Sequence, residues 1–174
     1  MGKLQSLVLA ALTFFGFRAA SAAINDTAQS VDDLEPLSKG EILDIVRRAV
    51  AAYSWMVPAD VMAVIETESQ FNVRAINPAD PSYGLMQIML PTAKDMGHSG
   101  SFVALMDPET NIRIGAKYLD WIRRYLAERF GRAPTRSEIF GAYNAGIGNV
   151  AKGYVPVRYV DKVLTARAKW ERVT

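Results

Sequence analysis

The sequence of 174 residues contains no cysteine and one histidine. Without cysteine there is no disulfide framework, no thiolate metal site and no lipid-modified N-terminal cysteine. One histidine, His98, forms neither a metal site nor a catalytic triad by itself. The sequence also lacks a phosphate-binding glycine loop, a cluster of metal ligands and a nucleophile elbow. We therefore expect no metal and no cofactor, and we place His98 in a surface loop.

Long apolar runs are missing as well. The apolar run Leu7 to Phe17 is too short for a comfortable membrane span, and it follows the positive charge of Lys3. Ala20-Ser21-Ala22 fits a small-x-small cleavage site. Residues 1–22 are therefore predicted to be a signal peptide that directs export to the periplasm or cell envelope. The alternative, suggested by Arg18 beside the cleavage region, is that the segment is retained as a weak anchor.

Neither sign of charge is in large excess. The sequence has 20 basic and 18 acidic residues. The leader contains two of the basic residues and no acid, and four acids precede Ser38. The segment from Lys39 onward thus holds 18 basic and 14 acidic residues, a net charge of +4. This mild bias suits an anionic cell-wall polymer. Because there is no basic stripe with interleaved aromatics, we expect no nucleic-acid partner.

The remainder of the chain is long enough for one domain, and half of all residues are hydrophobic. Residues 23–38 are polar, acidic and without periodicity, which is typical of a flexible linker. Residues 39–174 are predicted to form a single, mostly helical domain. Capping boxes, prolines and glycines at helix ends place helices over residues 39–53, 58–70, 92–96, 108–130, 136–144 and 159–170. Phe71 to Tyr83 is turn-rich, so at most short strands are expected there. In the helix 108–130, Trp121 and Tyr125 are expected to widen the buried face.

The helix that begins at Pro58 carries a carboxylate in an apolar position. Val64 and Ile65 belong to its apolar stripe, and Glu68 lies four and three residues beyond them, on the same face. Burying an ionised carboxyl is costly, so the pKa of Glu68 is expected to rise, as a general acid requires. Glu66 points about 200° away on the helix. The alternative is a helix-end Glu68 that extends into water.

Four motifs, in order, resemble those of the soluble lytic transglycosylases that cleave bacterial peptidoglycan. They are Glu68-Ser69-x-Phe71, Gly84-Leu85-Met86-Gln87, the middle-helix pattern Asp107-Pro108-x-x-Asn111-Ile112-x-x-Gly115-x-x-Tyr118-Leu119, and Ala142-Tyr143-Asn144-Ala145-Gly146. The resemblance runs from about Val57 to Val163. It implies a lysozyme-like α+β fold, mostly α, with a small β-loop region beside the cleft.

The resemblance also implies the reaction and makes residues 39–174 a catalytic domain. Glu68 would protonate the bridging oxygen between MurNAc and GlcNAc and then deprotonate the C6 hydroxyl of the muramic acid, which gives a 1,6-anhydro product without water. Six residues are carried over as substrate contacts: Ser69, Met86, Gln87, Tyr143, Asn144 and Tyr159. Tyr143 is expected to place its hydroxyl near Glu68.

Five of the six carried-over contacts, all but Tyr159, have a structural alternative. Ser69 fits a helix end whose hydroxyl bonds a carbonyl. Met86, between two apolar residues, fits the core. Gln87 fits an exposed strand end, Tyr143 the aromatic core, and Asn144 a helix terminus.

The sequence departs from the family pattern in the connector between Glu68 and Gln87. Ser82 stands where a smaller residue, usually alanine, is common, and the connector is about one residue longer than usual. Asp80 is the other acid close in sequence that could face the cleft, but no family motif places a catalytic acid there. Because hydrolases usually need a second carboxylate, the pattern favours the transglycosylase.

Two other hypotheses are compatible with the same sequence features. A goose-type hydrolytic lysozyme shares the fold and the single acid. A wall-binding or assembly module would keep the fold without turnover. Peptidoglycan strands are the expected partner, and a secretion, conjugation or phage lysis apparatus is compatible with a small exported domain.

Overall fold

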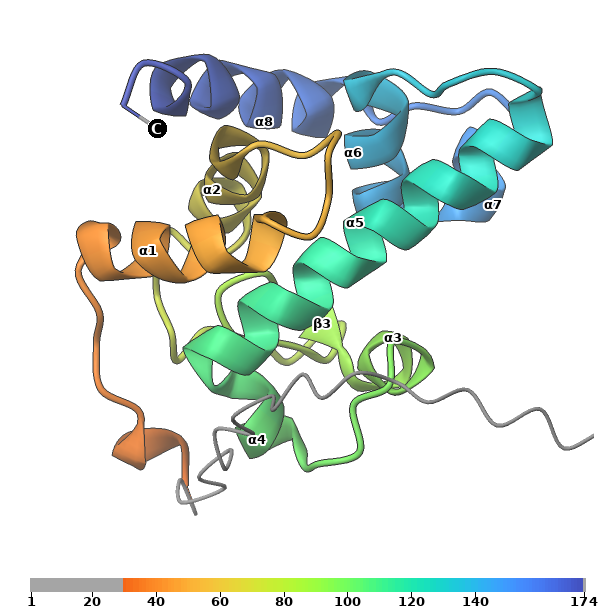
Figure 1. Ribbon diagram of the computed structural model, residues 1–174. Helices are drawn as coiled ribbons and strands as arrows, with labels where there is room; N and C mark the ends of the chain where they lie inside the picture. The colour runs from red at the N-terminus through yellow and green to blue at the C-terminus, as the bar shows by residue number, and fades with distance from the viewer. Residues whose placement is uncertain (1–29, 174) are drawn as a thin grey trace, which may run out of the picture.

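The computed structural model describes residues 30–173. The signal peptide predicted at 1–22 lies outside this range. The order of elements is η1 Val31–Asp33, α1 Lys39–Val50, α2 Pro58–Glu68, β1 Ile76–Asn77, β2 Ser82–Tyr83, β3 Ile88–Met89, α3 Leu90–Asp95, α4 Phe102–Met106, α5 Pro108–Phe130, α6 Arg136–Ala145, α7 Ile147–Val150 and α8 Val157–Trp170 (Figure 1).

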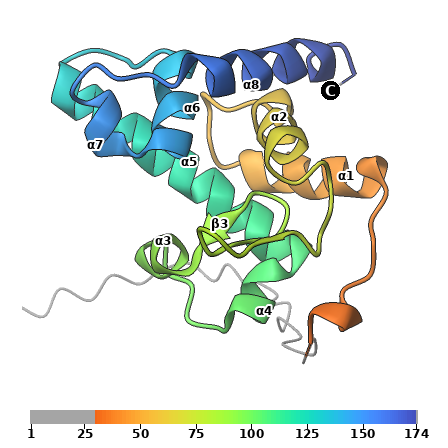
Figure 2. The ribbon, with the colours of Figure 1, turned by 180° about the vertical axis from the view of Figure 1, so that it is seen from behind.

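Helix α2 lies at the centre of the domain. Pro58 begins it, because proline at a first helical position gives up only an amide that would be unpaired there. Seven consecutive residues, 59–65, are fully buried, so this helix is enclosed on all sides rather than along one stripe. It packs most extensively against α8 and also against α1, and it lies between these two helices in both ribbon views (Figures 1 and 2).

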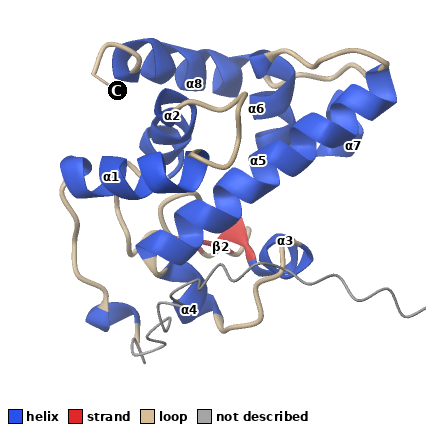
Figure 3. Ribbon diagram, viewed as in Figure 1, coloured by secondary structure: helices blue, strands red, loops and turns tan. Residues whose placement is uncertain are grey.

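The strands form a small antiparallel sheet in the order β1-β2-β3. Ile76 pairs with Tyr83, and Tyr83 pairs with Ile88. Each strand has two residues, as expected for a turn-rich segment containing two prolines (Figure 3). The sheet leads directly into α3, and together they form a β lobe that packs against the N-terminal half of α5.

Helix α5 holds the β lobe through two motif residues. The Asn111 carboxamide accepts a hydrogen bond from the Met86 amide at 2.8 Å and donates to the carbonyls of Tyr83 and Leu105 at 2.9 and 3.0 Å. At Gly115 a Cβ atom would lie 2.2 Å from the Met86 sulfur. The spacing of asparagine and glycine therefore reflects the close contact of a helix with a loop.

A buried carboxylate joins three helices. Asp60, in the first turn of α2, is fully buried. It accepts hydrogen bonds from Arg136 on α6 at 2.8 Å and from Arg167 on α8 at 2.6 Å. It also accepts the Val57 amide at 2.9 Å. Asp60 is thus the common partner of α2, α6 and α8.

Several predicted helix bounds need correction: α3 spans Leu90–Asp95 rather than 92–96, and α8 begins at Val157 rather than at 159. Helix α1 ends at Val50, and Pro58 to Glu68 is shorter than predicted because Ser69 caps it. The short helices α4 and α7 lacked a periodic signal long enough to predict them.

The part of the predicted linker that the structure describes, residues 30–38, lies against the domain. Leu34 is buried, and Arg74 donates hydrogen bonds to the carbonyls of Leu34 and Asp32 at 2.8 and 3.0 Å. The two leucines of this polar segment, Leu34 and Leu37, gave no periodicity from which to predict this docking. Among the described residues, no helix is long and apolar enough to cross a membrane.

The two α5 aromatics expected to widen the buried face behave differently. Trp121 is partly buried and packs against the core beside Leu119, Ile122 and Leu126. Tyr125 is 42% exposed and does not belong to the buried face.

Candidate active site

A cleft of about 320 Å³ lies between α6 and the β lobe. Its lining comes from every element around it: Glu68, Asn77, Asp80, Ser82, Gln87, Ile88, Met89, Thr92, Tyr118, Tyr143, Asn144, Ala145 and Gly146. Two larger grooves, of about 590 and 690 Å³, lie along α8 and do not contain Glu68.

Glu68 is the last residue of α2 and faces this cleft. Burial raises the pKa of its carboxyl above the ordinary value, and the hydrogen bond from Tyr159 partly opposes that rise. Raising the pKa of a carboxyl by burial keeps more of it protonated near neutral pH. The expected apolar position of Glu68 is thus found, and the side chain does not extend freely into water.

Tyr159, near the start of α8, supplies the hydroxyl that contacts the acid. Its hydroxyl donates to Glu68 Oε1 at 2.6 Å. Burial and the neighbouring Glu68 raise the pKa of Tyr159 well above its ordinary value, so it stays a donor. This bond joins residues 91 positions apart, which no local pattern predicts.

Tyr143 lies in the same cleft but bonds elsewhere. Its hydroxyl donates to the Met86 carbonyl at 2.7 Å. Burial raises the pKa of Tyr143, and the proximity of Glu68 raises it further. The hydroxyl expected to orient the acid therefore belongs to Tyr159 in this structure, while Tyr143 joins α6 to the β lobe and forms a wall of the cleft.

The carboxamide of Gln87 is engaged within the protein. Its Nε2 donates to the carbonyls of Ala75 and Gly84 at 3.1 and 2.9 Å, and its Oε1 accepts from Ser82 at 3.0 Å. Gln87 lines the cleft, yet both of its amide protons point into the loop. Ser82, a departure from the family pattern, thus has a role in holding Gln87.

Two predicted substrate contacts do not reach the cleft. The Met86 side chain is fully buried against Gly115, so its structural alternative, a core residue, describes it. The Ser69 hydroxyl donates to the Ile65 carbonyl at 3.1 Å, as expected for a helix end, and Ser69 is not among the lining residues.

Asn144 and Asp80 lie in the cleft with exposed side chains. Asn144 makes no side-chain hydrogen bond to the described residues, so its carboxamide is open to a ligand. Asp80 is likewise without an ion pair there. Sequence reasoning placed both on the cleft side, but Tyr118 and Thr92, which also line it, lacked an assigned role.

Glu66 points away from the cleft, as the helical phase predicted. It accepts from Lys169 at 2.8 Å and from the Trp170 indole, both at the end of α8. Burial raises its pKa, but the hydrogen bonds from Lys169 and Trp170 outweigh this effect, and the net pKa is lowered. Two carboxyls two residues apart on one helix therefore have pKa shifts of opposite sign.

Backbone strain is concentrated at this site. Gln70, Phe71 and Gln87 are the non-glycine residues with positive φ among the described residues, at 53°, 68° and 48°. The first two lie two and three residues after Glu68, and the third lines the cleft. Left-handed backbone at such residues persists where the surrounding structure imposes it, and it is concentrated at functional sites.

Comparison with known proteins agrees with this geometry. The family model described as the Transglycosylase SLT domain matches residues 45–157. The membrane-bound lytic murein transglycosylase C of Edwardsiella ictaluri is 38% identical over 118 residues, which cover 63% of this chain and 32% of that protein. Its counterpart in Yersinia pestis is 36% identical with the same coverage.

Solved structures show the same fold. The 70 kDa soluble lytic transglycosylase of Escherichia coli is 29% identical with a TM-score of 0.60, covering 75% of this chain and 24% of that one. A complex of the 70-kDa enzyme with bulgecin A is 28% identical with a TM-score of 0.61, covering 79% of this chain and 25% of that one. The chain therefore spans about a third or less of these relatives. The match covers more than half of this chain and includes Glu68, Gln87 and Tyr143, so the chain belongs to the family of the Transglycosylase SLT domain.

Proposed function

We propose that this protein is a peptidoglycan lytic transglycosylase that cleaves the β-1,4 bond between MurNAc and GlcNAc without water. The observation that carries the proposal is the partly buried carboxyl of Glu68, with a raised pKa and a hydroxyl donor at 2.6 Å, in an open cleft. The family match supports the same reaction.

In this reaction Glu68 gives its proton to the oxygen between the sugars, and the bond from that oxygen to C1 of MurNAc breaks. The electron pair of the bond leaves with the GlcNAc oxygen. The C6 hydroxyl oxygen of the same MurNAc then bonds to C1, and its proton passes to the Glu68 carboxylate. The acid returns to its starting state, and ring closure within one residue gains from proximity.

Tyr159 positions the acid in this scheme. Its hydrogen bond stabilises the ionised carboxyl that forms after proton donation, which is when the C6 hydroxyl must be deprotonated. The residues that face the substrate are Asn144 and the wall formed by Tyr118 and Tyr143.

Replacing Tyr159 with phenylalanine is expected to lower turnover about tenfold, because a hydrogen bond to a charged group contributes about 1.5–3 kcal/mol. The bond lowers the pKa of Glu68, so its loss raises that pKa. An acid must be protonated to act, so the alkaline limb of the pH–rate profile should move to higher pH. Rates on sacculi across pH measure both effects. Tyr154→Phe, an exposed hydroxyl, is the matched control. A lower rate with an unmoved limb would contradict the role of Tyr159.

Hydrolysis is the second candidate, because Asp80 lines the cleft together with Glu68. A hydrolase needs a carboxylate to activate water. Asp80 is exposed and lies in a turn where aspartate is common in any case.

Muropeptides released from purified sacculi are expected to end in 1,6-anhydro-muramic acid, which borohydride does not reduce. Mass spectrometry of products made in ¹⁸O-labelled water distinguishes the two reactions. Incorporation of one labelled oxygen per cleavage, with reducible ends, would replace this proposal with hydrolysis. Asp80→Asn is the matched variant. It should abolish hydrolysis if Asp80 activates water, because that role requires the charge, and it should leave cleavage unchanged if Asp80 only serves the turn.

Export to the cell envelope belongs to the same proposal. The predicted signal peptide supports it, and the relatives from Edwardsiella ictaluri and Yersinia pestis are named membrane-bound. A secretion, conjugation or phage lysis apparatus would be reached from the same compartment.

A further inference from the structure

One face of α5 carries aromatic rings that begin inside the cleft and end outside it. Tyr143 and Tyr118 line the cleft, with ring centres 5.5 Å apart. Trp121 stacks on Tyr118 at 5.9 Å, and Tyr125 follows Trp121 at 5.6 Å. We call these four residues the aromatic track. The three on α5 are spaced by three and four residues and so lie on one side of the helix.

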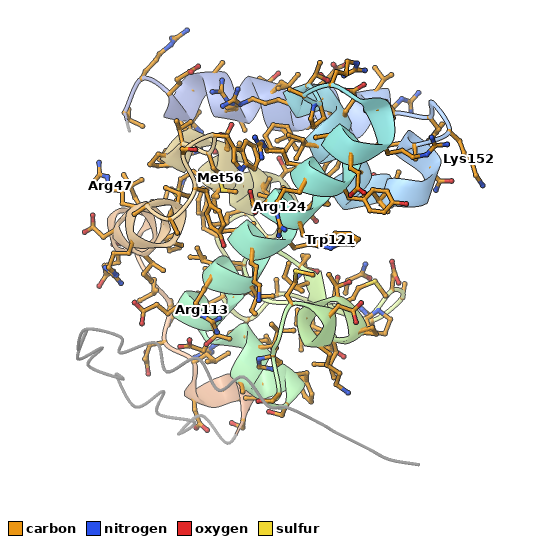
Figure 4. The ribbon with its side chains drawn as sticks, turned by 45° about the vertical axis from the view of Figure 1, so that its right-hand side comes forward. Arg47, Met56, Arg113, Trp121, Arg124 and Lys152 are labelled. Atoms are coloured by element: carbon orange, nitrogen blue, oxygen red, sulfur yellow. The ribbon has the colours of Figure 1, made fainter. Side chains whose placement is uncertain are left out.

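The outer half of the track is accessible. Tyr125 is 42% exposed and Trp121 is partly exposed. In Figure 4, Trp121 projects outward from α5, on the side where α7 lies above it and α3 below. Side chains that served only the core would be covered, as Leu119, Ile122 and Leu126 are on the adjoining face of the helix.

The indole of Trp121 also differs from the other two tryptophans. The Trp55 indole donates to Asp120 at 2.9 Å, and the Trp170 indole donates to Glu66. The Trp121 indole has no such partner among the described residues. Since no fully buried side-chain nitrogen or oxygen there lacks a partner, this N–H retains some access to solvent. It is available to donate to a bound molecule.

We propose that the aromatic track binds the glycan strand beyond the catalytic cleft. This inference rests on the proposed function, which makes the substrate a polymer. A cleft of about 320 Å³ is at the low end of the roughly 300–1,000 Å³ of pockets that hold one small ligand, so a long strand must continue over the neighbouring surface.

The chemistry of the track fits sugar rings. A pyranose has a face of C–H groups and a rim of hydroxyl and N-acetyl groups. Aromatic rings can cover the C–H face, and the Trp121 N–H can donate to a rim oxygen. Because Tyr118 belongs to both the cleft wall and the track, the bound strand would be continuous between them.

The first test compares a long substrate with a short one. Trp121→Ala is expected to raise the amount of sacculi needed for half-maximal rate about tenfold, as for a central aromatic contact. Tyr125→Ala should raise it severalfold. With a purified GlcNAc–MurNAc tetrasaccharide as substrate, the rise in the amount needed for half-maximal rate should be at least fivefold smaller than with sacculi. Phe102→Ala, which removes an aromatic ring with 38% exposure from α4, is the matched control. Equal losses on both substrates would mean that Trp121 supports only the cleft, and no loss on either would also overturn the inference.

A binding measurement separates this inference from the proposed function. In a Glu68→Gln background, co-sedimentation with sacculi needs no turnover. Adding Trp121→Ala should weaken binding about tenfold, and Trp121→Phe, which keeps a ring but removes the N–H, should weaken it less. Unchanged binding by Trp121→Ala overturns the aromatic track, whichever product the unmodified enzyme forms. Wild-type products with reducible ends would overturn only the proposed reaction.

Discussion

Replacing Glu68 with glutamine is expected to lower the cleavage of sacculi by about 10³-fold, because glutamine keeps the size of the side chain and removes the transferable proton. The release of soluble muropeptides from sacculi measures this loss. Glu66→Gln on the same helix is the matched control and should retain most activity, since Lys169 and Trp170 hold Glu66 away from the cleft. If Glu66→Gln lost activity and Glu68→Gln retained it, Glu66 rather than Glu68 would be the acid.

The Glu68→Gln variant should not lose stability. The pKa of Glu68 is raised in the folded state, so between the ordinary value of 4.5 and the raised value the folded protein binds more protons than the unfolded one. Stability therefore falls as the pH rises through this window. Glu68→Gln removes that dependence, and its melting temperature at neutral pH should equal or exceed that of the unmodified protein. A marked decrease would mean that lost activity reflects unfolding.

The largest loss of stability is expected for Asp60→Ala. This substitution leaves the guanidinium groups of Arg136 and Arg167 without their carboxylate and frees the Val57 amide. Breaking a buried ion pair costs about 3–5 kcal/mol. For a domain of this size that corresponds to a fall in melting temperature of roughly 10 °C. Urea denaturation, monitored by tryptophan fluorescence, gives the free energy of unfolding.

Asp44→Ala is the control for Asp60→Ala. Its carboxylate pairs with Arg47 at 3.1 Å on the surface, where both side chains are about half exposed or more. Such a pair contributes at most about 1 kcal/mol. If Asp60→Ala cost no more than this control, the contact between α2, α6 and α8 would not depend on the buried charge. Activity should fall together with stability, because these three helices carry Glu68, Tyr143 and Tyr159.

The sequence predicted the helices best where local chemistry sets their ends. Pro58 begins α2, Asp107 and Pro108 begin α5, and Gly131 ends α5 in a left-handed conformation. These positions depend on the nearest backbone groups, so a single sequence contains the information. The opposite directions of Glu66 and Glu68 follow from the helical repeat in the same way.

The partners of these residues required the fold. The hydrogen bond of Tyr159 to Glu68 and the ion pairs of Asp60 join residues far apart in the chain. Met86 and Gln87 also needed the fold, because the motif places both near the cleft. Packing turns the Met86 side chain into the core, and the Gln87 amide is hydrogen-bonded within the loop.

By itself, then, the sequence determined which carboxyl lies on an apolar face and which family motifs surround it. Those features depend on residue type and on spacing along one helix. The tertiary structure decided which hydroxyl contacts Glu68, and it left the outer rings of Trp121 and Tyr125 exposed beside the cleft. Helical spacing fixes the direction of a side chain about its own axis, but only the packing of other helices decides whether that direction leads to the core, to the cleft or to solvent.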